Sequence, residues 1–378
     1  MNKIIEKNTL HNSSPLRGDK RGAYKNIFAS KWGIVMAGIA IGIIAIFLQF
    51  WGNPPNMGLC MACFLRDIAG GLKLHTAAPV QYIRPEIIGI LLGAATIAML
   101  KGEFKPRGGS SPLIRFFLGF FAMIGALVFL GCPWRAYLRL AGGDFNAVTG
   151  LAGLSTGIYI GTLFIKRGFN LGRAKASQSK MSGYIMPAVM IALLALLAFN
   201  FTKLAFSTKG PGAMHAPLII SLVGGLLVGY FAQRSRFCTI GAIRDIFIIR
   251  NYHLFMGVAA FTVIAFVLNL TLGQFNPGIE GQPIAHSIHL WNFLGMVLSG
   301  LAFVLAGGCP GRQIILAGEG NTDSGIFILG MLLGAAVAHN FGLASSPKGI
   351  GEFGAIATFV GIGYTLIVGY VMTKRMGK

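Results

Sequence analysis

The sequence predicts an all-α polytopic membrane protein, and three observations predict it: an apolar composition, repeated apolar segments of spanning length, and an uneven placement of basic residues. Of the 378 residues, 54% are hydrophobic and only 11% are charged, and 54 are glycine. A water-soluble surface of this size could hardly be built from so few charged side chains. We therefore expect membrane lipid to surround the folded chain.

Ten apolar segments approach the length of about 20 residues that a helix needs to cross a bilayer. The predicted spans are Trp32–Trp51, Glu86–Leu100, Pro112–Leu130, Ala147–Ile165, Tyr184–Asn200, Ala216–Ala232, His253–Leu272, Leu290–Ala306, Asp323–His339 and Gly354–Met372. The polar, basic segment 1–31 before them reads as a disordered tail without a cleavable signal pattern.

The basic residues indicate how these spans are oriented. If segment 1–31 lies inside, the segments on its side of the membrane carry 24 of the 32 Lys and Arg residues. This bias is what the positive-inside rule predicts, so we expect a multi-pass protein of a bacterial inner (cytoplasmic) membrane with both termini cytoplasmic. It also explains the formal net charge of +21 without a nucleic-acid partner.

Four further segments are too short to span and are interrupted by Gly, Pro or Arg: Met57–Leu72, Cys132–Ala141, Phe237–Arg250 and Cys309–Ala317. We interpret them as re-entrant half-helices, which membranes tolerate where the chain is buried in protein or lines a cavity.

These segments belong to an internal repeat. Cys60–Ile68 matches Cys238–Ile246 at a spacing of 178 residues, and Gly131–Arg135 matches Gly308–Arg312 at a spacing of 177. Each copy holds four spans, and a fifth separates them, so the second copy would start from the opposite side of the membrane. The repeat is therefore expected to be inverted, an arrangement in which secondary transporters place their substrate near the midplane.

The expected organisation has five parts. They are a basic tail at 1–31, a first transmembrane repeat at 32–165, a linker with one connecting helix at 166–215, the inverted second repeat at 216–339, and a loop, last helix and basic C-terminus at 340–378.

Cysteines and arginines of the short segments are the candidate substrate-binding residues. They are Cys60, Cys63, Cys132, Cys238, Cys309, Arg66, Arg135, Arg244 and Arg312. A thiol is a soft, polarisable group suited to sulfur or selenium species, although a single buried cysteine is more often a packing residue. An arginine in the hydrocarbon region costs about 2.5–3.5 kcal/mol or more, so it needs a partner or a watery cavity and would favour an anion.

Two acidic residues, Asp67 and Asp245, each follow one of these arginines. We expect them to neutralise the neighbouring charge or cap a helix, with proton relay as the alternative. No catalytic residue, metal site or cofactor is predicted: Gly307–Gly311 lacks the spacing of a phosphate-binding loop, and no nucleotide, haem or zinc motif is found.

At the motifs Cys60–Asp67, Gln81–Glu86 and Gly131–Arg135 the chain resembles the YeeE/YedE family of sulfur-transport membrane proteins, in particular its selenium-metabolism branch of the YedE/FdhT type. The resemblance extends from Trp32 to the C-terminus. It implies import of a selenium compound or thiosulfate-like anion along Cys60, Cys132, Cys238 and Cys309. A cytoplasmic sulfur- or selenium-carrier protein is a further candidate partner, on which the sequence itself is silent.

Two alternatives to transport of an anion remain open. Cys60 and Cys63 have the C-x-x-C spacing of redox motifs, so the chain could be a membrane thiol oxidoreductase or a sulfur or selenium relay protein. The second repeat weakens this hypothesis because it carries Gly241 where the first carries Cys63. The other alternative is a channel for a neutral small molecule, in which the cysteines serve only for packing. Of these possibilities we expect a transporter and not an enzyme.

Overall fold

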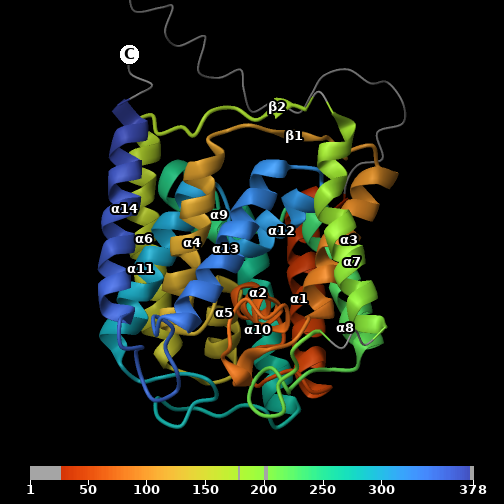
Figure 1. Ribbon diagram of the computed structural model, residues 1–378, viewed down its shortest axis with the longest axis vertical. Helices are drawn as coiled ribbons and strands as arrows, with labels where there is room; N and C mark the ends of the chain where they lie inside the picture. The colour runs from red at the N-terminus through yellow and green to blue at the C-terminus, as the bar shows by residue number, and fades with distance from the viewer. Residues whose placement is uncertain (1–26, 178, 200–202, 375–378) are drawn as a thin grey trace, which may run out of the picture.

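The protein is an all-α polytopic membrane protein, as its computed structural model shows for residues 27–177, 179–199 and 203–374 (Figure 1). Ten segments of the described chain are long and apolar enough to cross a membrane. Their long helices are α1 (Lys31–Phe50), α3 (Pro85–Leu100), α4 (Pro112–Phe129), α6 (Asn146–Lys166), α7 (Ile185–Ala198), α8 (Leu218–Ser235), α10 (His253–Thr271), α11 (His289–Ala306), α13 (Thr322–Asn340) and α14 (Gly354–Lys374).

All ten predicted spans are confirmed as helices, with boundaries that differ by a few residues. The predicted tail falls mostly outside the described residues. The remaining elements are the 3-10 turns η1 (Ile27–Ala29), η2 (Ala78–Val80) and η3 (Lys180–Tyr184) and a two-stranded antiparallel pair of β1 (Arg107–Gly108) and β2 (Lys175–Ala176).

A short helix forms in each of the four segments that the sequence singled out. They are α2 (Met61–Gly71), α5 (Pro133–Ala141), α9 (Thr239–Ile249) and α12 (Pro310–Gly318). The long helix before α5 ends at Leu130 with φ 62°, and the one before α12 ends at Gly307 with φ 95°. A left-handed residue terminates a helix. These two breaks lie 177 residues apart, which is the spacing of the sequence repeat.

The long helices pack in pairs that exchange partners between the two copies. Helix α3 packs against α8 while α10, the counterpart of α3, packs against α1; likewise α4 packs against α13 and α11 against α6. In Figure 1 α2 and α5 lie in the lower half of the molecule, and α9 and α12 in the upper half. A pseudo-two-fold axis in the membrane plane would produce this pattern. The inverted relation itself stays a prediction.

Glycines allow these helix pairs to approach closely. A Cβ atom on Gly89 of α3 would collide with the backbone of Leu222 in α8, and one on Gly38 of α1 would collide with the backbone of Gly257 in α10. Small residues at helix interfaces are the usual means of packing in a membrane, where apolar burial gives helices no reason to prefer each other over lipid.

The interior is more polar than the perimeter. Large apolar side chains such as Trp32, Phe199 and Ile219 are exposed on the outer surface, as lipid contact requires. The short helices lie inside, and every residue of α2 is buried, including Arg66 and Asp67. The fold thus surrounds charged side chains with ten long helices.

Candidate functional site

Four of the five cysteines occupy the position just before a short helix. Cys60, Cys132, Cys238 and Cys309 precede α2, α5, α9 and α12, each with an extended backbone. The sulfurs of Cys60, Cys238 and Cys309 each accept a hydrogen bond from the backbone N–H three residues further on, over 3.3 to 3.4 Å, and the backbone of Arg135 is close to the sulfur of Cys132 in the same way. The N-terminus of a helix carries a partial positive charge. Each sulfur therefore lies where negative charge is stabilised.

The cysteines meet as two clusters, one in each repeat. The thiols of Cys60 and Cys132 lie within hydrogen-bond reach of each other, and Cys63 lies beside Cys60. In the second repeat, the backbone N–H of Cys309 donates to Cys238 Sγ at 3.5 Å. All five are free thiols and at most 6% exposed. The structure therefore joins residues that lie about 70 positions apart in each copy, with no cysteine open to solvent.

Trp134 connects the two clusters. It follows Cys132 by two residues, yet its indole Nε1 donates to Cys309 Sγ of the other repeat at 3.4 Å. Its ring packs edge-on against Phe237 at 5.0 Å and lies against Gly311, which is its own counterpart in the second repeat. The indole is fully buried and stands between the clusters as a bulky apolar group.

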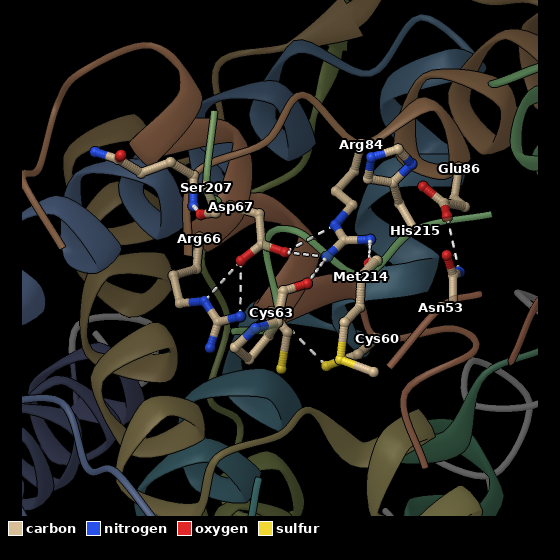
Figure 2. A network of polar contacts seen from close by, with 12 residues as sticks. Asn53, Cys60, Cys63, Arg66, Asp67, Arg84, Glu86, Ser207, Met214 and His215 are labelled. Atoms are coloured by element: carbon tan, nitrogen blue, oxygen red, sulfur yellow. Dashed lines mark hydrogen bonds and ion pairs between the residues drawn. The ribbon is translucent and has the colours of Figure 1, made fainter. Parts of the chain in front are cut away.

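Arg66 and Arg84 share one carboxylate. Asp67 Oδ1 accepts from Nε and Nη2 of Arg66 at 2.9 and 2.7 Å, and Asp67 Oδ2 accepts from Nε of Arg84 at 2.7 Å (Figure 2). Arg84 also donates to the backbone carbonyls of Pro211 and Met214. Two buried guanidinium groups on one carboxylate leave a net positive charge, which favours an anion nearby.

The second repeat has a looser version of this pair. Arg244 Nη2 lies 2.7 Å from Asp245 Oδ1, and the two side chains are 30% and 21% exposed. Both acidic residues thus neutralise the arginine beside them, which supports the first of the two roles considered for them. No second arginine bridges to Asp245 among the described ion pairs.

The other two predicted arginines have different surroundings. Arg135 is fully buried and donates to backbone carbonyls of Asn56, Leu130, Pro283 and Ile284. These four hydrogen bonds join the segments that carry the carbonyls, so Arg135 has a structural role in this conformation. Arg312 is less constrained, with Nη1 3.4 Å from Glu319 Oε1 and a side chain 14% exposed.

A cavity opens at each end of the molecule beside a cysteine-bearing helix. The larger cavity, of about 300 Å³, is lined by Arg66, Leu130, His339, Ser345 and neighbouring loop residues; we call it the outer cavity, and the other the inner cavity, after the orientation that the basic residues predict. The inner cavity, of about 230 Å³, is lined by Arg115, Arg244, Gly307 and the loop at 169–172. Arg66 and Leu130 are the repeat counterparts of Arg244 and Gly307. The two cavities are therefore related features of the two copies.

Sequence reasoning missed four of these residues as site candidates: Arg84, Trp134, His339 and Ser345. Arg84 and Trp134 stand within motifs that the sequence had already marked, and the mismatch of Trp134 with Gly311 was a signal of asymmetry. His339 and Ser345 carried no signal, because they lie more than 270 residues from Arg66 in the chain.

Comparison with known proteins gives a consistent set of relatives. A family model described as sulphur transport matches residues 2–160 and 234–374. A protein named thiosulfate transporter TsuA from Escherichia coli (strain K12) is 30% identical over 135 residues, which are 34% of this chain and 36% of that protein. A second thiosulfate transporter TsuA, from Spirochaeta thermophila, is 33% identical over 138 residues, 35% of this chain and 39% of that protein. The chain thus matches less than two fifths of either relative.

Proposed function

The chain belongs to the sulphur transport family, and we propose that it imports a small sulfur- or selenium-containing anion across a bacterial inner membrane along its cysteines. The observation that carries this proposal is the meeting of the four repeat-matched cysteines in two buried clusters bridged by Trp134. A set of packing cysteines would have no reason to gather at four helix N-termini.

The route begins at the outer cavity and ends at the inner one. An anion would enter beside Arg66, pass Cys60, Cys63 and Cys132, then reach Cys238 and Cys309, and leave beside Arg244. Each thiol can donate a weak S–H hydrogen bond to a soft sulfur or selenium atom, and each helix N-terminus stabilises the accompanying negative charge. Successive weak contacts hold an anion without trapping it.

Burial of both clusters implies that the route is closed in this conformation. Trp134 blocks the passage from one cluster to the other, so transport needs the indole to move relative to Cys309. Alternating access by inverted repeats provides such movement, because one repeat rocks against the other around a central site. The structure supports this interpretation through the exchanged helix pairs.

Orientation and cargo rest on independent arguments. The basic loops that carry β1 and β2 belong on the cytoplasmic side under the positive-inside rule, which makes the cavity at Arg66 the outer one. The curated relatives are named for thiosulfate, whereas the motif resemblance points to selenium. Soft thiols suit both elements, so we propose the class of anion and leave the choice of element to an uptake assay.

The assay compares uptake of labelled thiosulfate and labelled selenite in cells that lack their own importers. Cys60→Ala, Cys132→Ala, Cys238→Ala and Cys309→Ala should each abolish most uptake of the label that the unaltered protein carries. The matched control is Met61→Leu, which removes a buried sulfur beside Cys60 but no S–H group and little volume. Unchanged uptake in a chain without the four cysteines would exclude the cysteine route.

A thiol relay is the second candidate, because the backbone N–H of Cys63 donates to Cys60 Sγ at the start of α2. This geometry resembles that of redox motifs, in which a helix N-terminus stabilises a thiolate. The relay requires a Cys60–Cys63 disulfide that forms and is reduced during turnover. Trapping that disulfide in working cells, with Cys63→Ala inactive and Cys238→Ala active, would favour the relay over transport.

A further inference from the structure

The outer cavity contains polar atoms that its own walls leave unsatisfied. His339 Nε2 and Ser345 Oγ are both buried and have no hydrogen-bond partner in the described part of the chain. Both residues line the cavity together with Arg66. Buried polar groups almost always have a partner, and leaving one without costs about 1–3 kcal/mol. Two unsatisfied groups on residues that line the same small space indicate a ligand that a turn of either side chain would bring within reach.

The charge of the cavity specifies what kind of ligand. Arg66, Asp67 and Arg84 are at most 2% exposed and together carry one net positive charge. Figure 2 shows the third nitrogen of the Arg66 guanidinium turned away from Asp67. Of the described residues that line the cavity, none is acidic. Arg66 is therefore the charged group that an anion in the cavity would meet, since neither Asp67 nor the buried Glu86 lines it.

His75 holds the donors in place. Its Nε2 lies 3.1 Å from the backbone oxygen of Arg66, and its Nδ1 accepts from the backbone N–H of Ala77 at 3.3 Å. A carbonyl can only accept, so His75 is neutral with the proton on Nε2. Burial, helped by the Arg66 charge, lowers the pKa of His75, which keeps it neutral. Its ring packs against that of His339, with the ring centroids 4.7 Å apart.

The corresponding inner cavity has no counterpart of His339 or Ser345 among its lining residues, although Arg115, Arg244 and Asn170 line it. In the loop after α13, Ala344, Ser345 and Ser346 line the outer cavity, whereas in the loop after α6 the inner cavity is lined by Asn170, Leu171 and Gly172. Thr162, which matches His339 at the repeat spacing, bonds its own helix at Tyr159 O instead. The pair of His339 and Ser345 is thus found in the outer cavity and has no equivalent in the inner one.

We propose that Arg66, His339 and Ser345 form a docking site for a small oxoanion in the outer cavity, where the charge of Arg66 attracts it and the other two donate hydrogen bonds to its oxygens. The inference rests on the proposed transport function and adds a loading step before the cysteines. Arg66 lies six residues along α2 from Cys60, a rise of about 9 Å, so a docked anion would stand within one short step of the first cluster.

The test compares Ser345→Ala and His339→Gln with Ser346→Ala. Ser346 also lines the cavity, but it is exposed, so water can satisfy its O–H, and its oxygen accepts from the backbone N–H of Lys348. Loss of one hydrogen bond to an anion should raise the KM for thiosulfate or selenite uptake about tenfold in Ser345→Ala, with the maximal rate retained. Cysteine variants should lose the maximal rate instead. KM values for Ser345→Ala and His339→Gln within twofold of the unaltered protein would overturn the docking site while leaving cysteine-dependent transport intact.

A binding measurement keeps the site testable if no uptake is seen. Thiosulfate and selenite are titrated calorimetrically into the purified full-length protein, after size-exclusion chromatography has shown each variant to be folded. Binding by the unaltered protein and by Ser346→Ala, weakened about tenfold in Ser345→Ala, would support the site even if the transport proposal failed. If neither anion binds the unaltered protein, or if both bind Ser345→Ala and His339→Gln as well as Ser346→Ala, the docking site is wrong.

Discussion

The helices α2 and α9 start from the same nine-residue motif and end in different environments. Every residue of α2 is buried, and Asp67 is clamped between Arg66 and Arg84. In α9 only Thr239–Ile243 are buried, and the ion pair of Arg244 with Asp245 is partly exposed. The two copies therefore differ in how deeply the short helix and its ion pair are buried. The first copy carries a closed arrangement of buried charges, and the second carries a looser, partly exposed one.

The largest expected difference lies between the two acidic residues. Asp67→Asn leaves two buried guanidinium groups without their carboxylate, which should destabilise the protein by about 3–5 kcal/mol. Asp245→Asn disturbs a partly exposed pair that water screens, so we expect a cost of about 0–1 kcal/mol. Thermal unfolding followed by size-exclusion chromatography in detergent measures both.

A double variant separates charge from packing in this comparison. Arg84→Gln added to Asp67→Asn removes one of the uncompensated positive charges, so it should restore part of the lost stability although it changes a second buried residue. If Asp67→Asn and Asp245→Asn unfold at the same temperature, the contrast between the two copies has no energetic meaning.

The next effect concerns Trp134, whose place in the second repeat is taken by Gly311. Trp134→Ala should cost roughly 3–5 kcal/mol of stability through the cavity it leaves, and it should open a connection between the clusters. In a chain where Cys309 is the sole cysteine, a membrane-impermeant thiol reagent added outside intact cells should then label Cys309 severalfold faster. Trp134→Phe keeps an aromatic barrier and should leave Cys309 protected. Equal labelling of Cys309 with Trp, Phe or Ala at position 134 would show that the indole is no barrier.

Much of this fold follows from sequence because hydrophobic length alone sets the spans. Each of the ten long helices lies at a predicted segment, and the short helices begin right after Cys60, Cys132, Cys238 and Cys309. Repeat matching also placed the cysteines at equivalent positions. Span length and repeat spacing depend on residues that are near each other or regularly spaced in the chain, so they can be predicted from one sequence.

The partners of the buried charges could not be predicted in the same way. Arg66 and Arg135 both follow a motif cysteine in a short helix, yet one faces a carboxylate and a cavity while the other donates to four carbonyls. That difference depends on which distant loops fold over each helix, such as the loop of Pro283 and Ile284 above Arg135. Ser345 joins Arg66 for the same reason.

The smallest expected effect on stability comes from the polar contacts at the ends of two helix pairs, α3 with α8 and α1 with α10. Where α3 meets α8, Gln233 Nε2 donates to Glu103 Oε2 at 2.7 Å and Arg234 pairs with Oε1; where α1 meets α10, Gln49 Nε2 donates to the neutral Gln274 at 2.7 Å. Burial acts to raise the pKa of Glu103, but the bonds from Gln233 and Arg234 outweigh it and hold that pKa below its usual value.

A lowered pKa in the folded state means that the Glu103 carboxylate stabilises the protein at neutral pH and that this contribution is lost as the pH falls through the folded pKa. Because Glu103 is 44% exposed, screening limits the effect to about 1 kcal/mol or less. We expect Glu103→Gln to lower the unfolding temperature slightly at pH 7 and to match the unaltered protein once the pH falls below the lowered pKa of Glu103, with the exposed Glu352→Gln as control. A deficit that persists in acid would mean that Glu103 acts through packing, and the charged end of α3 and α8 would then be equivalent to the neutral end of α1 and α10.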